Sequence, residues 1–146
     1  SSAASDVYKR QKQVKITTTS DLINGGCNAC PNVKCTNYLV HVEDETIALE
    51  TLTVADLVTL LALKEGFRQK LVMEMFEEYT MFERETHQVV FKEEETRILF
   101  QSKKQTIQST LLSKEPQQVF QETQQILHQL FELEPFEFEL VEETDK

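Results

Sequence analysis

The sequence has few of the residues and segments that mark several common classes of protein. It contains only three glycines, which leaves no material for a glycine-rich phosphate-binding loop. The longest stretch without Asp, Glu, Lys or Arg is residues 22–33, which is too short for a membrane-spanning helix. No positively charged start leads into an apolar stretch, so no secretory signal is visible. We therefore expect a cytoplasmic protein with no membrane partner.

Motifs that would place a nucleophile beside a base are also absent. The sequence has neither a Gly-x-Ser-x-Gly turn nor a His-Glu-x-x-His pair. Carboxylates are abundant, but they stand at predicted turns and outward positions, as in Glu93-Glu94-Glu95 and in Glu137 and Glu139. Paired carboxylates support catalysis only where their environments differ. We expect a protein that is not an enzyme.

Basic residues are outnumbered, with 15 Lys and Arg against 25 Asp and Glu, and the formal charge is −10. Binding to a phosphate backbone needs clustered Lys and Arg, and the best cluster, Arg97 with Lys103 and Lys104, is thin. The charge therefore argues against nucleic acid and favours a protein partner, in particular a basic one. An acidic surface also serves solubility. The oligomeric state stays open.

The chain length suits one domain, preceded by a short segment of different character. Residues 1–11 show no useful periodicity and resemble translated sequencing-adapter read-through. We expect 1–11 to be a non-native or disordered leader, and 12–146 to form a single α+β domain.

Apolar and β-branched residues at alternate positions predict several strands. These are a strand at 14–19, a hairpin over 38–51 that turns at 43–45, a second hairpin from 86–92 and 96–101, and a half-exposed strand at 136–140. Residues 21–37, with Asn24-Gly25-Gly26 and Pro31, are typical of a loop. Residues 102–113 are ambiguous.

Helical spacing predicts three helices. The first covers 54–63, with Thr53 and Asp56 close to a capping box and Gly66 as a stop signal. The second, 67–83, has a charged face opposite an apolar stripe, which consists of Phe67, Leu71, Val72, Met75, Phe76, Tyr79 and Phe82. The third begins at Pro116. The order of elements favours an α+β fold, an antiparallel sheet built from hairpins with about three helices packed on one face.

All three cysteines lie within nine residues, as Cys27-x2-Cys30-x4-Cys35. Close-spaced thiolates suit zinc, which needs four ligands, and His41 is the next candidate along the chain. This spacing resembles a zinc knuckle in which the third and fourth ligand types are exchanged. The resemblance implies a zinc site formed by Cys27, Cys30, Cys35 and His41.

Strand geometry sets a condition for that site. If residues 35–41 are all extended, Cys35 and His41 lie about 20 Å apart at ~3.3 Å per residue, so they share a metal only if Thr36-Asn37 turns back. His87 and His128 are more distant alternatives as ligands. Without zinc, the cysteines are reduced thiols on a cytosolic loop, a redox pair at Cys27 and Cys30, or part of an iron–sulfur site.

These observations favour a small acidic, non-enzymatic protein-interaction domain, at the scale of accessory proteins of phages and mobile elements. Its natural contact surfaces are the acidic C-terminal strand, open to strand addition, and the surplus apolar groups Met73 and Met81. No cofactor is expected for this function. The alternatives are a zinc-stabilised module that uses the cysteine cluster and a thiol-dependent enzyme.

Overall fold

The computed structural model describes residues 12–23, 33–112 and 114–142, with the side chains of 20–23 and 33–36 excepted. The chain divides into two compact units, Ser1–Leu52 with Phe136–Lys146 (unit 1) and Thr53–Pro135 (unit 2). The expected leader, 1–11, lies outside the described residues.

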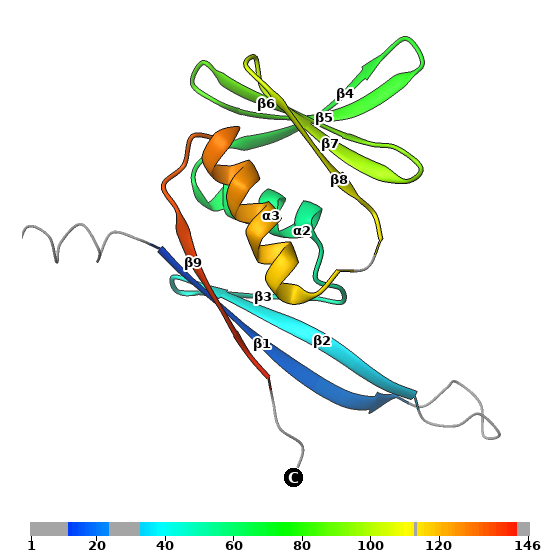
Figure 1. The fold of residues 1–146 in the computed structure, drawn as a ribbon, viewed down its shortest axis with the longest axis vertical. Helices are drawn as coiled ribbons and strands as arrows, with labels where there is room; N and C mark the ends of the chain where they lie inside the picture. The colour runs from blue at the N-terminus through cyan, green and yellow to red at the C-terminus, as the bar shows by residue number, and fades with distance from the viewer. Residues whose placement is uncertain (1–11, 24–32, 113, 143–146) are drawn as a thin grey trace, which may run out of the picture. The chain divides into compact units, whose positions relative to one another are not determined.

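Unit 1 is a four-stranded sheet with the strand order β3-β2-β1-β9 (Figure 1). Its strands are β1 (Lys12–Ile23), β2 (Val33–Val42), β3 (Glu45–Leu49) and β9 (Phe136–Val141). The first three strands pair antiparallel, whereas β9 joins β1 in parallel. Alternate residues of β1 and β2 place four buried side chains on one face: Val14, Ile16, Val40 and Val42.

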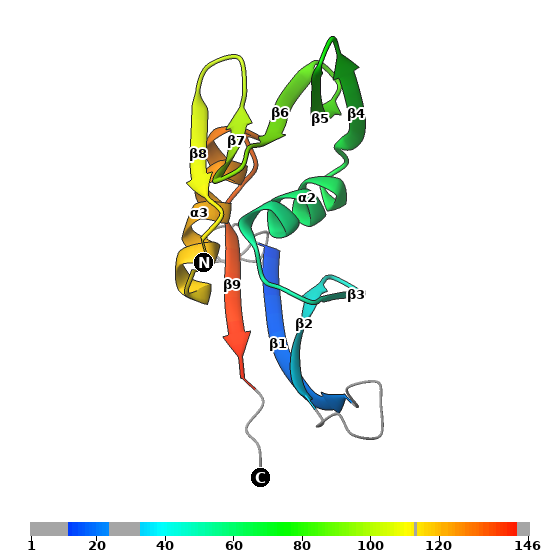
Figure 2. The same cartoon turned by 90° about the vertical axis from the view of Figure 1, so that its right-hand side faces the viewer.

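Unit 2 combines a five-stranded antiparallel sheet with two helices (Figure 2). Its elements are α2 (Val54–Lys64), β4 (Arg68–Glu74), β5 (Glu77–Arg84), β6 (His87–Glu93), β7 (Arg97–Gln101), β8 (Thr106–Thr110) and α3 (Pro116–Gln129). Strands adjacent in sequence are neighbours in the sheet, so β4 and β8 are its edges. Phe82 has no exposed surface, and the ring of Phe131 packs edge-on against the rings of Phe82 and Phe67.

The predicted ends of α2 are confirmed. The hydroxyl of Thr53 accepts a hydrogen bond from the backbone N–H of Asp56 at 3.2 Å, as expected for an N-cap residue. Gly66, just beyond the last turn, has a φ of +93°, which glycine adopts without the steric cost of a Cβ atom. Pro116 is the first residue of α3, also as predicted.

The predicted strand at 14–19, both predicted hairpins and the strand at 136–140 are confirmed. The loop expected at 21–37 is wrong at both ends, because β1 and β2 pair as far as Ile23 opposite Val33. Residues 24–32 lie outside the described residues. The ambiguous segment 102–113 contributes β8, which pairs with β7.

The expected fold, an antiparallel sheet with about three helices on one face, is wrong. The described residues form nine strands in two sheets and only two helices, and one strand pair is parallel. The helix expected at 67–83 is the hairpin of β4 and β5. Helix propensity is only a weak preference. It is outweighed in this segment because β5 is hydrogen-bonded to strands on both sides and buries Phe82.

No helix among the described residues has the length and apolar character needed to cross a membrane.

Candidate interaction surface

The predicted metal ligands are only partly within the described structure. Cys27 and Cys30 lie outside the described residues. Cys35 is in β2, with its Cα opposite that of Asp21 in β1. His41 is in the same strand, and each of its ring nitrogens lies near a threonine hydroxyl, Nε2 at 3.1 Å from Thr17 Oγ1 and Nδ1 at 3.0 Å from Thr46 Oγ1.

The structure does not bring Cys35 and His41 together. Strand β2 is continuous from Val33 to Val42, with Thr36 and Asn37 paired to β1, so the six steps between the two residues span about 20 Å. No group of three His, Cys, Asp or Glu residues that could hold a metal occurs in the part of the chain that the structure describes. A zinc site at the three cysteines stays a prediction.

The other two histidines have hydrogen-bond partners within unit 2. The Nε2 atom of His87 is 2.6 Å from the carbonyl oxygen of Leu130, and the Nδ1 atom of His128 is 3.0 Å from that of Leu133. The carboxylate of Glu132 lies 3.7 Å from Nδ1 of His87. These contacts tie the segment after α3 to β6 and to the helix itself, which is a structural role.

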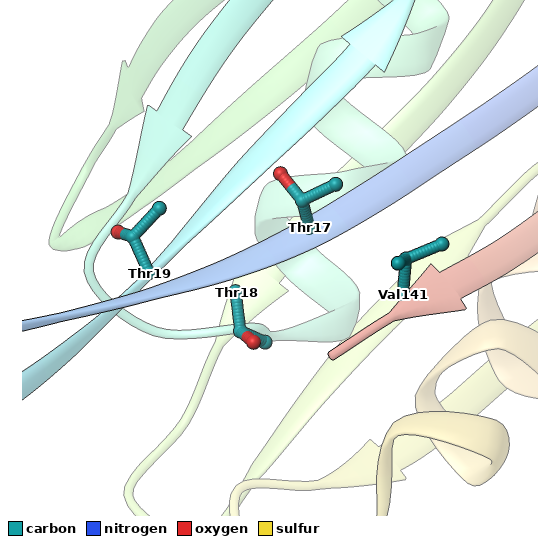
Figure 3. Close-up of a pocket in the computed structure, with 4 residues that line it drawn as sticks. All are labelled: Thr17, Thr18, Thr19 and Val141. Carbon is teal, nitrogen blue, oxygen red and sulfur yellow. The ribbon is translucent and has the colours of Figure 1, made fainter. Parts of the chain in front are cut away.

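A shallow pocket of about 280 Å³ lies in unit 1 where β9 ends beside β1. It is lined by Thr17, Thr18, Thr19 and Val141, and Figure 3 shows Thr18 on the opposite side of β1 from Thr17 and Thr19. Hydroxyl and methyl groups line it, and none of these four side chains is a general acid or base at neutral pH. The pocket therefore does not suggest catalysis.

A buried polar cluster joins the segment before α3 to the sheet of unit 2. The ammonium group of Lys114 lies 2.9 Å from Oε1 of Glu122 and contacts the hydroxyl of Ser109, which donates to the same oxygen at 2.6 Å. Oε2 of Glu122 is buried and has no hydrogen-bond partner among the described residues. The lysine and the serine are occupied by the carboxylate, so we assign the cluster to stability.

The most unusual surface of the described residues is an apolar patch on the β4–β5 hairpin, whose turn projects away from α2 and α3 (Figures 1 and 2). Four large apolar side chains are exposed there, which we call the hairpin patch: Leu71 (59%), Met73 (75%), Met75 (101%) and Phe76 (105%). Leu71 and Met73 alternate along the edge strand β4, and Met75 and Phe76 form the turn. Exposed groups of this size contribute nothing to a core.

Carboxylates surround the turn. Glu74 stands directly opposite Glu77 across the hairpin, and Glu78 stands opposite Met73. Partial burial raises the pKa of Tyr79 above its ordinary value of 10.0, and the negative charges of Glu74 and Glu77 raise it further. The end of the hairpin is therefore apolar at its turn and negative around it.

Sequence reasoning found only part of this surface. It singled out Met73 as a surplus apolar group but assigned Leu71, Met75 and Phe76 to the apolar stripe of the helix expected at 67–83. The alternation of charge along β4 was the available signal, because Arg68, Lys70 and Glu74 all fall on one face of a strand. No glycine, proline or asparagine marks the turn.

Comparison with curated proteins and with solved structures gives no match. The family model of the domain of unknown function DUF4809 matches residues 11–140, a span that includes all of unit 2, most of unit 1, and all described strands and helices apart from the last residue of β9. The chain therefore belongs to the DUF4809 family.

Proposed function

We propose that this chain is a small acidic, non-enzymatic protein-interaction domain that docks through the hairpin patch. The observation that carries the proposal is the joint exposure of Leu71, Met73, Met75 and Phe76 on one projecting hairpin. Apolar groups gathered on the surface and rimmed by charged residues are typical of protein–protein contact sites. Methionine and aromatic side chains are also the types that such contacts favour.

The turn itself supports this proposal. Met75 has a φ of +53°, in the left-handed region, which costs a residue other than glycine about 1 kcal/mol. Glu43 and Glu85 take the same position in two other hairpin turns, where a polar side chain faces water. Met75 instead exposes an apolar side chain without any gain in core packing, which a binding role explains.

The charges around the patch define the chemistry of the partner. Glu74, Glu77 and Glu78 would repel an acidic surface and attract a basic one. The partner that fits is a protein with an apolar contact surface flanked by Lys or Arg. Because these carboxylates are exposed, higher salt should weaken the complex.

The test starts with a photo-cross-linking amino acid at position 76 in the full chain and, as a control, at Leu112, which is also a large apolar residue and is exposed. Cross-linking in extract of cells that encode the chain, followed by mass spectrometry, identifies what contacts each position. The captured protein is then purified and titrated against the wild type, the double variant M75S/F76S and the control L112S.

We expect saturable binding by the wild type and by L112S, and a loss of about tenfold or more in affinity for M75S/F76S, because a few large side chains contribute most of the binding energy in such contacts. Equal binding by all three proteins would show that the hairpin patch is not the docking surface. Cross-links that are the same from positions 76 and 112 would contradict the proposal as well.

A further inference from the structure

The outer edge of β4 has backbone groups that are directed away from its own sheet. The hairpin turn has two residues, Met75 and Phe76, so Glu74 and Glu77 on either side of it exchange both of their hydrogen bonds. By alternation, Val72, Lys70 and Arg68 also bond to β5. Gln69, Leu71 and Met73 direct their N–H and C=O groups to the outer edge, where no described strand pairs with β4 and another strand can be added.

The charges of β4 are arranged along the strand with opposite signs at its two ends. Arg68 and Lys70 lie near its start and Glu74 lies at its end. Among the described residues, no carboxylate is within ion-pair distance of Arg68 or Lys70. Glu74 faces the like charge of Glu77, which is unfavourable, although Lys92 Nζ lies 3.5 Å from the Glu77 carboxylate and offsets part of that charge. A strand with this pattern is complementary to itself when it runs in the opposite direction.

From this pattern we infer that the partner of the hairpin patch is a second copy of this chain, paired antiparallel through β4 with Leu71 at the twofold axis. This inference rests on the proposed function and names its partner. Leu71 would lie opposite Leu71 of the second copy, Gln69 opposite Met73, and Arg68 opposite Glu74. The three outward residues of each copy would form about six N–H···O bonds. The basic groups that the acidic turn requires are then supplied by Arg68 of the other copy.

Neighbouring registers are less favourable. Pairing centred on Lys70 places two lysines opposite each other, which is repulsive. Pairing centred on Val72 aligns Lys70 with Glu74, but it leaves Arg68 and Gln69 beyond the end of the partner strand. Only the register centred on Leu71 uses all seven residues of β4 and pairs both Arg68 and Glu74 with an opposite charge.

The test measures the mass of the full chain by sedimentation over a range of concentrations, for the wild type, R68E, E74R and a one-to-one mixture of the two variants. The control K103E makes the same charge change as R68E at an exposed lysine outside β4. We expect a reversible dimer for the wild type and K103E. In the dimer, R68E and E74R each place two pairs of like charges opposite each other, one pair at each end of the interface. The dissociation constant of the dimer should therefore rise about tenfold or more.

The mixture is the decisive sample. When an R68E copy pairs with an E74R copy, the two substituted side chains face each other with opposite charges, and the unchanged Glu74 of the first copy faces the unchanged Arg68 of the second. The mixture should therefore form a heterodimer where each variant alone is monomeric. E74R also removes the repulsion between Glu74 and Glu77 within one hairpin, so its loss of dimer cannot be attributed to a weakened hairpin. A monomeric mixture would overturn the inference.

A proline at position 71 provides a second variant. L71P removes an N–H that is directed to the open edge and leaves the hydrogen bonds to β5 in place, so we expect a folded monomer by circular dichroism and sedimentation. If the wild type stays monomeric but M75S/F76S still binds a captured partner more weakly than the wild type does, only the second-copy inference is overturned. A monomer that also binds no captured partner at the hairpin would overturn the proposed function as well.

Discussion

The two ends of the β4–β5 hairpin carry similar residues in opposite environments. Phe82, near the base, has no exposed surface and packs against Phe131 with ring centroids 5.5 Å apart. Phe76, at the turn, is 105% exposed. Both lie in one stretch of apolar residues at helical spacing, so the sequence does not distinguish them. Coverage by other elements separates an apolar residue that stabilises unit 2 from one that is available for binding.

Two arginines at the base of the hairpin differ in the same way, although they lie on neighbouring strands. Arg84, at the base, donates a hydrogen bond to the carbonyl oxygen of Glu65 at 2.7 Å, and its guanidinium lies over the ring of Phe67 at 4.5 Å. Arg68 lies on the neighbouring strand β4, opposite Glu83, and its side chain is exposed. Arg84 therefore ties β5 to the segment after α2, whereas no carboxylate among the described residues is within ion-pair distance of Arg68.

The largest expected difference in stability is between the truncation of Phe82 and the truncation of Phe76. Phe82→Ala removes a fully buried ring and leaves a cavity, so the free energy of unfolding should fall by about 3–5 kcal/mol. Phe76→Ala should change it by less than about 0.5 kcal/mol. Urea denaturation followed by circular dichroism measures both. Similar losses from the two substitutions would show that the turn is covered in solution.

Two lysines give the next comparison. Lys114→Met removes the cation that faces the largely buried carboxylate of Glu122, and we expect a loss of about 3 kcal/mol in the free energy of unfolding. Lys70→Met changes an exposed side chain and should alter stability by less than about 0.5 kcal/mol. The same denaturation experiment applies, with K114M/E122M recovering part of the loss. A stable Lys114→Met protein would contradict the assignment of this cluster to stability.

The two arginines should differ less. Arg84→Gln removes the hydrogen bond to Glu65 and the contact with the Phe67 ring, which together are worth about 1–2 kcal/mol. Arg68→Gln should have an effect within about 0.5 kcal/mol when the protein is dilute enough to be monomeric. Thermal unfolding of both variants at one low concentration tests the difference, and an equal shift in melting temperature would contradict it.

The sequence predicts those elements whose local signals agree with their environment. Thr53 with Asp56 and Gly66 define α2, and the alternation of Phe136, Phe138 and Leu140 defines β9. These signals depend on neighbouring residues, so they can be detected without knowledge of the rest of the chain. The parallel pairing of β9 with β1 depends on residues more than a hundred positions apart, and no local pattern encodes it.

The β4–β5 hairpin shows why the remainder could not be predicted. Glu, Met, Lys and Gln favour helices on their own, and Leu71 and Phe82 fit a helical stripe. The strand conformation depends on pairing of β5 with β6, which supplies bonds that a helix would satisfy internally. The turn at Met75 has none of the usual turn residues, so the exposure of the patch became visible only in the structure.

The smallest expected effect is a change in the titration of Tyr79. Partial burial, then Glu74 and Glu77, raise its pKa, so the neutral phenol is favoured in the folded protein. The resulting contribution to stability is present below the ordinary tyrosine pKa and is lost as the pH rises through the raised value. Glu74→Gln removes one negative charge and should lower the pKa of Tyr79 toward 10.0. The phenolate absorbance of wild type minus that of Y79F isolates this residue, and an unchanged midpoint in Glu74→Gln would show that the carboxylate at the hairpin turn does not act on the tyrosine.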